Sequence, residues 1–154
     1  MTSTDPNSPS AKYDLRNTSV ILHYREDSED RQFNLLTVLR YLNTYFNFHS
    51  VHVINDGANV DKILNYVKTE YPDTRLLFCK NDDEFKKAYC FNEAASQTTG
   101  EVLCFWDVDI LIEGGFIEKA QNDILAGHVD HVYPFTGLFV DVEKKAFDKI
   151  FPGF

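Results

Sequence analysis

Short apolar runs alternate along the chain with amphipathic stretches, and this alternation predicts strands and helices in turn. Continuous apolar runs of a few residues are typical of strands buried on both faces. The final two runs, after residue 130, are short and lie close together. The predicted strands are 18–24, 51–54, 75–79, 102–106, 131–134 and 137–142.

Between the predicted strands, apolar residues recur three or four positions apart, which indicates one face of a helix. The first helix has Leu35, Leu39, Leu42 and Phe46 on its apolar face, and the second has Val60, Ile63, Leu64 and Val67. Further helices are predicted over 84–98, from residue 114 with Phe116, Ala120, Ile124 and Leu125 inward, and over 143–151.

Strict alternation of strands and helices predicts right-handed crossovers and a mostly parallel, Rossmann-like α/β sheet flanked by helices. Ligands of such sheets bind beyond the carboxyl ends of the strands. Residues 1–16 are polar and contain two prolines, so they are expected to form a flexible tail. Residues 17–154 are expected to form one ligand-binding domain, because 154 residues suffice for a single core.

Composition narrows the possible partners. With 44% hydrophobic residues the protein is globular, and a net charge of −9 argues against nucleic acid or an anionic membrane as a partner. The cysteines, Cys79, Cys90 and Cys104, lack metal-ligand spacing and are expected to be reduced core thiols. No signal peptide or apolar run of transmembrane length is present, so a soluble, cytoplasmic protein is expected.

Acidic residues gather where three predicted strands end. The ends read Tyr24-Arg25-Glu26-Asp27, Asn55-Asp56 and Asp107-Val108-Asp109. If Asp107 and Asp109 continue the strand, their side chains point the same way and converge. Mg²⁺-like ions bind one or two carboxylates together with substrate phosphates, which favours a bridging cation. The alternative is a polar strand end that leads into a turn.

The same edge offers groups that suit a nucleotide diphosphate. Tyr24 provides a flat ring for a base, although ordinary packing explains it equally well, and Asp56 provides an acceptor. Lys86 and Lys87, near the start of the helix before the Asp-x-Asp strand, are placed to reach phosphate. No glycine-rich phosphate loop occurs in the sequence, so a metal ion is expected to hold the phosphates.

These motifs resemble the GT-A glycosyltransferases, in particular family 2-like enzymes of the galactosyltransferase and chondroitin-polymerase type. Their donor site reads Pro-Phe-Arg, then Phe-Asn-Arg-Ala with a later Asn, then Asp-Val-Asp. The corresponding segments here, in the same order, are His23-Tyr24-Arg25, Phe85-Lys86-Lys87-Ala88 with Asn92, and Phe105-Trp106-Asp107-Val108-Asp109-Ile110.

The resemblance implies a metal-dependent hexosyltransferase that moves sugar from a nucleotide diphosphate, with UDP favoured, to a saccharide or other hydroxyl acceptor. It implies Mn²⁺ or Mg²⁺ bound by Asp109 and Asp107, the latter also touching ribose or sugar. It places Tyr24 and Arg25 at base and diphosphate, Asp56 at the uracil or its equivalent, and Phe85 and Lys87 beside the nucleotide. Asn92 and Val108 complete the implied substrate site.

The sequence departs from the family pattern in ways that leave alternatives open. Lys87 replaces an arginine and loses its bidentate contact with phosphate, and His23 replaces a proline. In the family, an acidic stretch with the catalytic base follows the Gly-Phe that ends this sequence. The chain is therefore either a fragment of a longer enzyme or a minimal domain, and its catalytic residue is unassigned. The alternatives are a non-catalytic nucleotide-sugar-binding domain and a haloacid-dehalogenase-type phosphatase.

Overall fold

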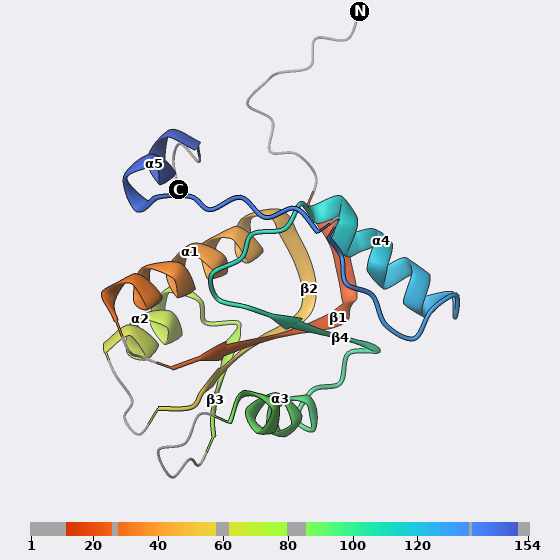
Figure 1. The fold of residues 1–154 in the computed structure, drawn as a ribbon. Coiled ribbons are helices and arrows are strands. Elements are labelled where there is room, and N and C mark those ends of the chain that lie inside the picture. Colours follow the sequence, from red (N-terminus) through yellow and green to blue (C-terminus); the bar gives the residue numbers. More distant parts are fainter. Residues whose placement is uncertain (1–11, 26–27, 58–61, 80–85, 136, 151–154) are drawn as a thin grey trace, which may run out of the picture.

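The computed structural model describes residues 12–25, 28–57, 62–79, 86–135 and 137–150. Strands and helices alternate from β1 to α4 as the sequence predicts, and α4 is followed by a further helix, α5 (Figure 1). The elements are β1 (Tyr13–Tyr24), α1 (Glu29–Tyr45), β2 (Phe46–Asn55), α2 (Lys62–Glu70), β3 (Thr74–Phe78), α3 (Lys87–Ala95), β4 (Val102–Trp106), α4 (Gly114–Leu125) and α5 (Lys144–Ile150).

The strands form a parallel sheet in the order β3-β2-β1-β4. Helices α1 and α2 cover one face and α3 covers the other (Figure 1). The predicted α/β class, a parallel sheet flanked by helices, is confirmed. Chain order reverses between β1 and β4, because the crossover through α3 passes to the far edge of β1. In open α/β sheets, ligands bind beyond the carboxyl ends of the strands at such a reversal.

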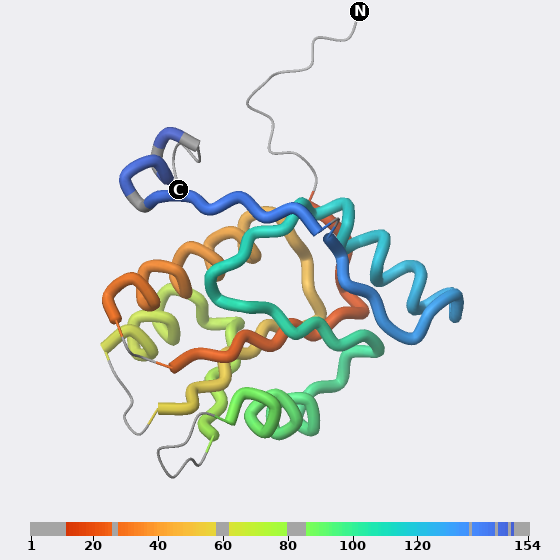
Figure 2. Tube along the Cα trace, viewed as in Figure 1, coloured from red at the N-terminus to blue at the C-terminus, as the bar shows by residue number. Residues whose placement is uncertain are grey.

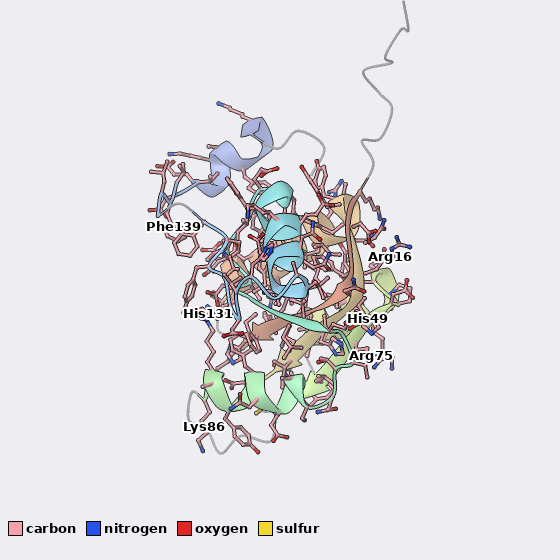
Figure 3. All side chains as sticks on the ribbon, turned by 90° about the vertical axis from the view of Figure 1, so that its right-hand side faces the viewer. Arg16, His49, Arg75, Lys86, His131 and Phe139 are labelled. Carbon is pink, nitrogen blue, oxygen red and sulfur yellow. The ribbon has the colours of Figure 1, made fainter. Side chains whose placement is uncertain are left out.

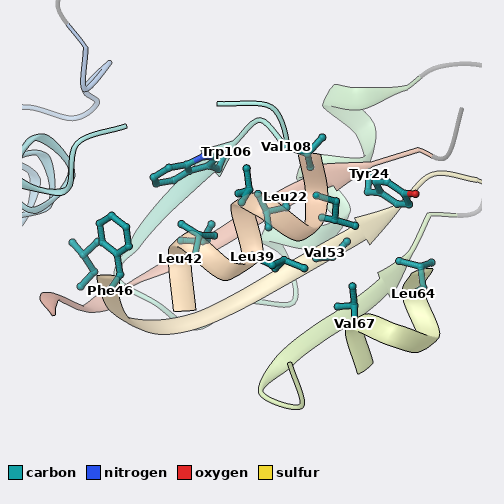
Figure 4. Close-up of a cluster of buried hydrophobic side chains, with 14 of the residues drawn as sticks. Leu22, Tyr24, Leu39, Leu42, Phe46, Val53, Leu64, Val67, Trp106 and Val108 are labelled. Carbon is teal, nitrogen blue, oxygen red and sulfur yellow. The ribbon is translucent and has the colours of Figure 1, made fainter. Parts of the chain in front are cut away.

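The pleat of the strands divides the core between the two faces. Leu22 is fully buried in the larger cluster, which includes Leu39 of α1 (Figure 4). Its neighbour Ile21 points the other way, into a smaller cluster with Cys90 and Ala94 of α3. Because successive side chains on a strand alternate between faces, both faces of β1 are apolar and need a helical cover.

Helix α1 begins where its sequence provides a cap. The Ser28 side chain accepts a hydrogen bond from the backbone N–H of Arg31 (3.2 Å), and Glu29 and Asp30 place negative charge in the first turn. Both features satisfy or complement the exposed N–H groups of a helix start. Along the helix, the buried residues are Leu35, Val38, Leu39 and Leu42.

Two strands extend further toward their amino ends than the sequence predicts. β1 begins at Tyr13, inside the range 1–16 that was expected to be a tail, because Tyr13 and Leu15 pair with Phe46 and Phe48 of β2. Phe46, predicted on the apolar face of the first helix, is instead the first residue of β2, where it is still buried. The expected boundary at residue 17 is therefore too late.

The strands predicted at 131–134 and 137–142 are wrong. The described residues there belong to no helix or strand, and Leu138, Phe139 and Val140 are exposed. Figure 2 shows this segment running back from α4 toward α5, and Figure 3 shows Phe139 near one side of the molecule. Strand propensity is realised only with a pairing partner, and the described sheet ends at β4 on this side.

The predicted inward face of α4 is also wrong. Phe116 is 47% exposed, whereas Ile117 and Gln121 are buried. Gln121 can be buried because its side chain accepts a hydrogen bond from Thr18 Oγ1 (2.7 Å) and donates one to the backbone oxygen of Asp14 (3.0 Å). A hydrophobicity pattern cannot identify a polar residue whose hydrogen bonds are satisfied in the interior.

Candidate functional site

Three polar residues follow neighbouring strands at one edge of the sheet. Arg25 follows β1, Asp56 follows β2 and Asp107 follows β4. Because the three strands are parallel and adjacent, their carboxyl ends meet at the same edge. The prediction that these strand ends share one edge is confirmed, and the edge includes the ends of β1 and β4, between which the chain order reverses.

Asp56 is buried and bound to two basic side chains. Its Oδ2 lies 2.8 Å from His23 Nε2, and its Oδ1 lies 3.4 Å from Arg25 Nη1. Its backbone N–H donates to the oxygen of Tyr24 (3.0 Å). Burial lowers the pKa of His23 below 6.5, and the Asp56 carboxylate offsets only part of this effect. His23 is therefore neutral near pH 7, and Arg25 is the charged partner of Asp56.

The carboxylate of Asp107 forms an ion pair with Lys87 at the start of α3. Both side chains are partly exposed, at 45% and 37% respectively. The Lys87 ammonium also lies 5.5 Å from the ring centre of Phe91, within the range of a cation–π contact. The pair therefore joins α3 to the end of β4 in a position that solvent can reach.

The Asp-x-Asp residues lie in a turn rather than in the strand. β4 ends at Trp106, and the N–H of Ile110 points to the oxygen of Asp107 (3.4 Å). Val108 is buried in the main cluster, whereas Asp109 is exposed. The two acids therefore do not continue the strand, and the expectation that the strand pleat points their side chains the same way is wrong.

Two hydrogen bonds fix the segment that carries the acids. Trp106 Nε1 donates to the backbone oxygen of Ile110 (2.8 Å), and the Tyr41 hydroxyl of α1 donates to that of Ile112 (2.7 Å). Burial raises the pKa of Tyr41 to about 12, so it stays a donor at ordinary pH. Trp106 itself is buried in the main cluster (Figure 4). The turn is thus held on a rigid part of the fold.

The side chains of the other predicted site residues are placed differently. Tyr24 is fully buried in the main cluster, which matches its alternative interpretation as a packing residue (Figure 4). Asn92 is exposed on α3. Phe85 lies outside the described residues.

The sequence analysis missed His23 as a partner of Asp56, and Cys90 as their neighbour. One ligand atom from each of these residues lies within 4.8 Å of the other two, and all three residues are buried. Because side chains alternate along a strand, His23 lies on the same face of the sheet as Ile21. Asp56 comes two residues after Ile54, just beyond the end of the adjacent strand, and therefore lies on the same face as Ile54. The pairing of β1 with β2 would have been enough to find the contact, but it is not visible in either strand alone.

The two acids of the turn provide the type of ligand atom that the predicted metal ion prefers. Asp107, which is partly exposed, and Asp109, which is exposed, offer carboxylate oxygens, the ligands that Mg²⁺ and Mn²⁺ prefer. A second group of potential ligands, His23, Asp56 and Cys90, combines nitrogen, oxygen and sulfur. This second set is of a different chemical type.

Comparison with known proteins identifies the family. Residues 20–149 match glycosyl transferase family 2, and the chain belongs to that family. Family and parallel sheet together confirm the expected GT-A type of fold. No match was found among the curated proteins.

One similar solved structure is the mannosyltransferase PcManGT from Pyrobaculum calidifontis in complex with GDP-Man and Mn²⁺. It shares 17% identity at a TM-score of 0.48, over 75% of this chain and 33% of that one. The present chain thus spans about a third of that protein. Among the described residues, no helix combines the length and apolarity needed for a membrane crossing.

Proposed function

We propose that this chain is the sugar-donor-binding part of a metal-dependent glycosyltransferase. It binds a nucleotide-diphosphate sugar, with a UDP-sugar favoured, together with Mn²⁺ or Mg²⁺. The enzyme transfers the sugar to a hydroxyl of a saccharide or other acceptor. Membership of glycosyl transferase family 2 supports the reaction class.

The observation that carries this proposal is the meeting of Arg25, Asp56 and the Lys87–Asp107 pair at one edge of the sheet. Arg25 and Lys87 provide positive charge for a diphosphate on a protein whose net charge is −9. Asp56 is an acceptor for the N–H of a nucleobase, which would compete with the contacts of His23 and Arg25. Charge and hydrogen-bonding groups of this kind suit a nucleotide diphosphate.

In this proposal Asp109 and Asp107 hold the metal ion, which when bound neutralises negative charge on the departing nucleotide diphosphate. Lys87 exchanges its contact with Asp107 for one with phosphate oxygens. Trp106 and Tyr41 keep the turn in place while this exchange occurs. The base that removes the proton of the acceptor hydroxyl is not assigned.

The family match favours a transferase over the phosphatase alternative. The Asp-x-Asp turn follows the fourth strand in chain order, whereas the phosphatase nucleophile normally follows the first. A non-catalytic domain that binds nucleotide sugars would use the same residues and differ only in turnover.

Thermal unfolding with a panel of nucleotide sugars, each with and without Mn²⁺, tests the donor site. We expect at least one UDP-sugar to raise the melting temperature only when the metal is present, because binding to the folded state alone stabilises it. Asp109→Ala should abolish this metal-dependent shift.

Asp73→Ala provides a matched control, because Asp73 is exposed in the turn before β3, at the amino end of that strand. This variant should retain the full metal-dependent shift. If no nucleotide sugar stabilises the wild-type chain in a metal-dependent way, or if Asp109→Ala responds as the wild type does, the proposed donor site is wrong.

A further inference from the structure

Beneath the proposed donor site, three elements bring unlike ligands into one buried cluster. His23 comes from β1, Asp56 follows β2 and Cys90 belongs to α3. One ligand atom from each residue lies within 4.8 Å of the other two, and the residues are at most 2% exposed. The cluster lies on the α3 face of the sheet, with Ile21 and Ile54 beside Cys90 in the smaller core cluster.

The types of ligand distinguish this cluster from the acids of the turn. Imidazole nitrogen, carboxylate oxygen and cysteine sulfur together are the set that Zn²⁺ and Co²⁺ accept, whereas Mg²⁺ prefers oxygen alone. Cys79, which follows β3, forms a side-chain hydrogen bond with Cys90 and adds a second sulfur next to the cluster. A tetrahedral site commonly uses four such ligands.

The spacing is compatible with an ion after a small adjustment. In a tetrahedral zinc site, neighbouring ligand atoms are about 3.4–3.7 Å apart, as follows from bond lengths of about 2.0–2.3 Å. His23 Nε2 and Asp56 Oδ2 are now 2.8 Å apart across a hydrogen bond, so they would separate slightly as the ion takes the place of the shared proton. Arg25 can keep its contact with the other oxygen, Asp56 Oδ1.

Charge also favours an ion with a sulfur ligand. Binding of the metal displaces the proton of the Cys90 thiol and leaves a thiolate ligand. The resulting thiolate and the Asp56 carboxylate place two negative charges beside the divalent ion, while the partly exposed Arg25 keeps its contact with Asp56 Oδ1. A buried ion that is balanced by its own ligands avoids the cost of an isolated buried charge.

We propose that His23, Asp56 and Cys90 form a binding site for a divalent transition-metal ion of the Zn²⁺ or Co²⁺ class, separate from the Asp107–Asp109 turn. The site ties the ends of β1 and β2 to α3. It depends on residues of this chain alone and needs no nucleotide. It shares Asp56 with the proposed sugar-donor site but includes neither Lys87 nor the Asp107–Asp109 turn, so its failure would not contradict the donor site.

Titration of the reduced chain with Co²⁺ alone, in the absence of nucleotide, tests this site. We expect a near-ultraviolet charge-transfer band from the thiolate sulfur to Co²⁺, and loss of that band when Zn²⁺ displaces the cobalt ion. Cys90→Ser should lose the band and weaken Zn²⁺ binding by at least about tenfold, since even the loss of an outer partner of a metal ligand typically costs 10–100-fold.

Cys104→Ser is the matched control. Cys104 lies on β4 and packs against the main cluster, on the other face of the sheet from Cys90. This variant should keep the band, and Asp109→Ala should also keep it. The proposal is overturned if the wild-type chain shows no thiolate band, or if the band persists in Cys90→Ser. Circular dichroism of Cys90→Ser confirms that a lost band does not reflect a lost fold.

Discussion

At the scale of single residues, Lys87 links two parts of the proposed site. Its ammonium pairs with Asp107, a proposed metal ligand, and the same charge is the closest one on α3 available to a phosphate. In the proposal, Lys87 therefore competes with the metal for Asp107 but attracts the nucleotide. These opposite effects can be separated experimentally.

Lys87→Gln should bind Mn²⁺ alone slightly more tightly and the nucleotide sugar with Mn²⁺ more weakly. The gain for the metal should not exceed about fivefold, because a partly exposed ion pair contributes about 0.2–1 kcal/mol. Isothermal titration calorimetry with each ligand measures both effects. Lys119→Gln, which removes the partner of Asp123 on α4, should change neither affinity; a parallel change in both variants would contradict the role of Lys87.

The buried side chain of His52 should make the free energy of unfolding depend on pH. It is fully buried on β2, where a hydrogen bond of 2.8 Å joins Nε2 to Ser50 Oγ, and burial, followed by the charges of Arg75 and His49, lowers its pKa below 6.5. As the pH falls through 6.5 toward this lowered value, the unfolded chain takes up a proton that the folded chain resists, so the free energy of unfolding declines.

His52→Gln should reduce this decline, because glutamine keeps a partner for Ser50 but does not titrate. Urea unfolding between about pH 7.5 and pH 5.5 measures the slope. The wild-type chain should lose more stability over this interval than the variant does. If the two proteins lose equal stability, His52 does not contribute to the acid sensitivity.

The sequence predicted the placement of Asp56 and Asp107 because each directly follows an apolar run, and parallel strands end at one edge. It did not predict the partners of these acids. The contact of His23 with Asp56 depends on which strands are adjacent, and the contact of Lys87 with Asp107 depends on where α3 begins. Both depend on tertiary arrangement, which hydrophobic periodicity does not encode.

At the scale of elements, the close approach of α4 to β1 depends on a glycine. A methyl group on Gly114 would lie 2.1 Å from a ring carbon of Tyr13, a separation that real side chains do not adopt. Tyr13 is held in place by its hydrogen bond to Glu113 (3.0 Å) and by the ring of Phe46 (5.6 Å between centres). The helix start and the strand must therefore move apart to accept any side chain.

Gly114→Ala should destabilise the protein by about 1–3 kcal/mol, the typical cost of overpacking. Gly115→Ala is the control, since its methyl group would meet only the flexible Glu113 carboxylate at 3.1 Å and alanine favours a helix. Chemical denaturation compares the two variants. Equal stability of both would show that Tyr13 can move aside without cost.

The elements that the sequence predicted correctly are those with a repeated apolar pattern, such as α1. The structure of the elements that it predicted wrongly depends on contacts with other elements of the fold. Residues 131–142 have apolar side chains but no paired strand, and the inward face of α4 includes Gln121, whose burial depends on hydrogen bonds to residues of β1. Neither feature is visible in the local sequence.

At the scale of the whole molecule, the predicted parallel sheet is confirmed, but the strand order could not be predicted. The alternation of elements is the same whether β4 lies beside β1 or beside β3. The observed position beside β1 requires α3 to cover the second face of the sheet, and it places the reversal of chain order at the proposed donor site. The most informative feature for function was thus one that only the structure provides.

We expect a protease to cleave the segment between α4 and α5 before it cleaves the sheet. Within this segment Tyr133 and Leu138 are more than 75% exposed, whereas α5 packs on α1 through Phe147 and Phe33 at 5.5 Å between ring centres. Chymotrypsin should therefore cut first within 133–140, since exposed irregular backbone is the preferred site of nicking. Mass spectrometry identifies the first cut; an initial cut within 13–125 would contradict this expectation.

Trp106 gives the protein an internal optical reporter. It is the only tryptophan in the chain, so all indole emission comes from one ring at the end of β4. The indole N–H donates a hydrogen bond to the backbone oxygen of Ile110, next to the turn that carries Asp107 and Asp109. Any rearrangement of this turn on ligand binding changes the surroundings of a single fluorophore, which allows titrations without a dye or a label.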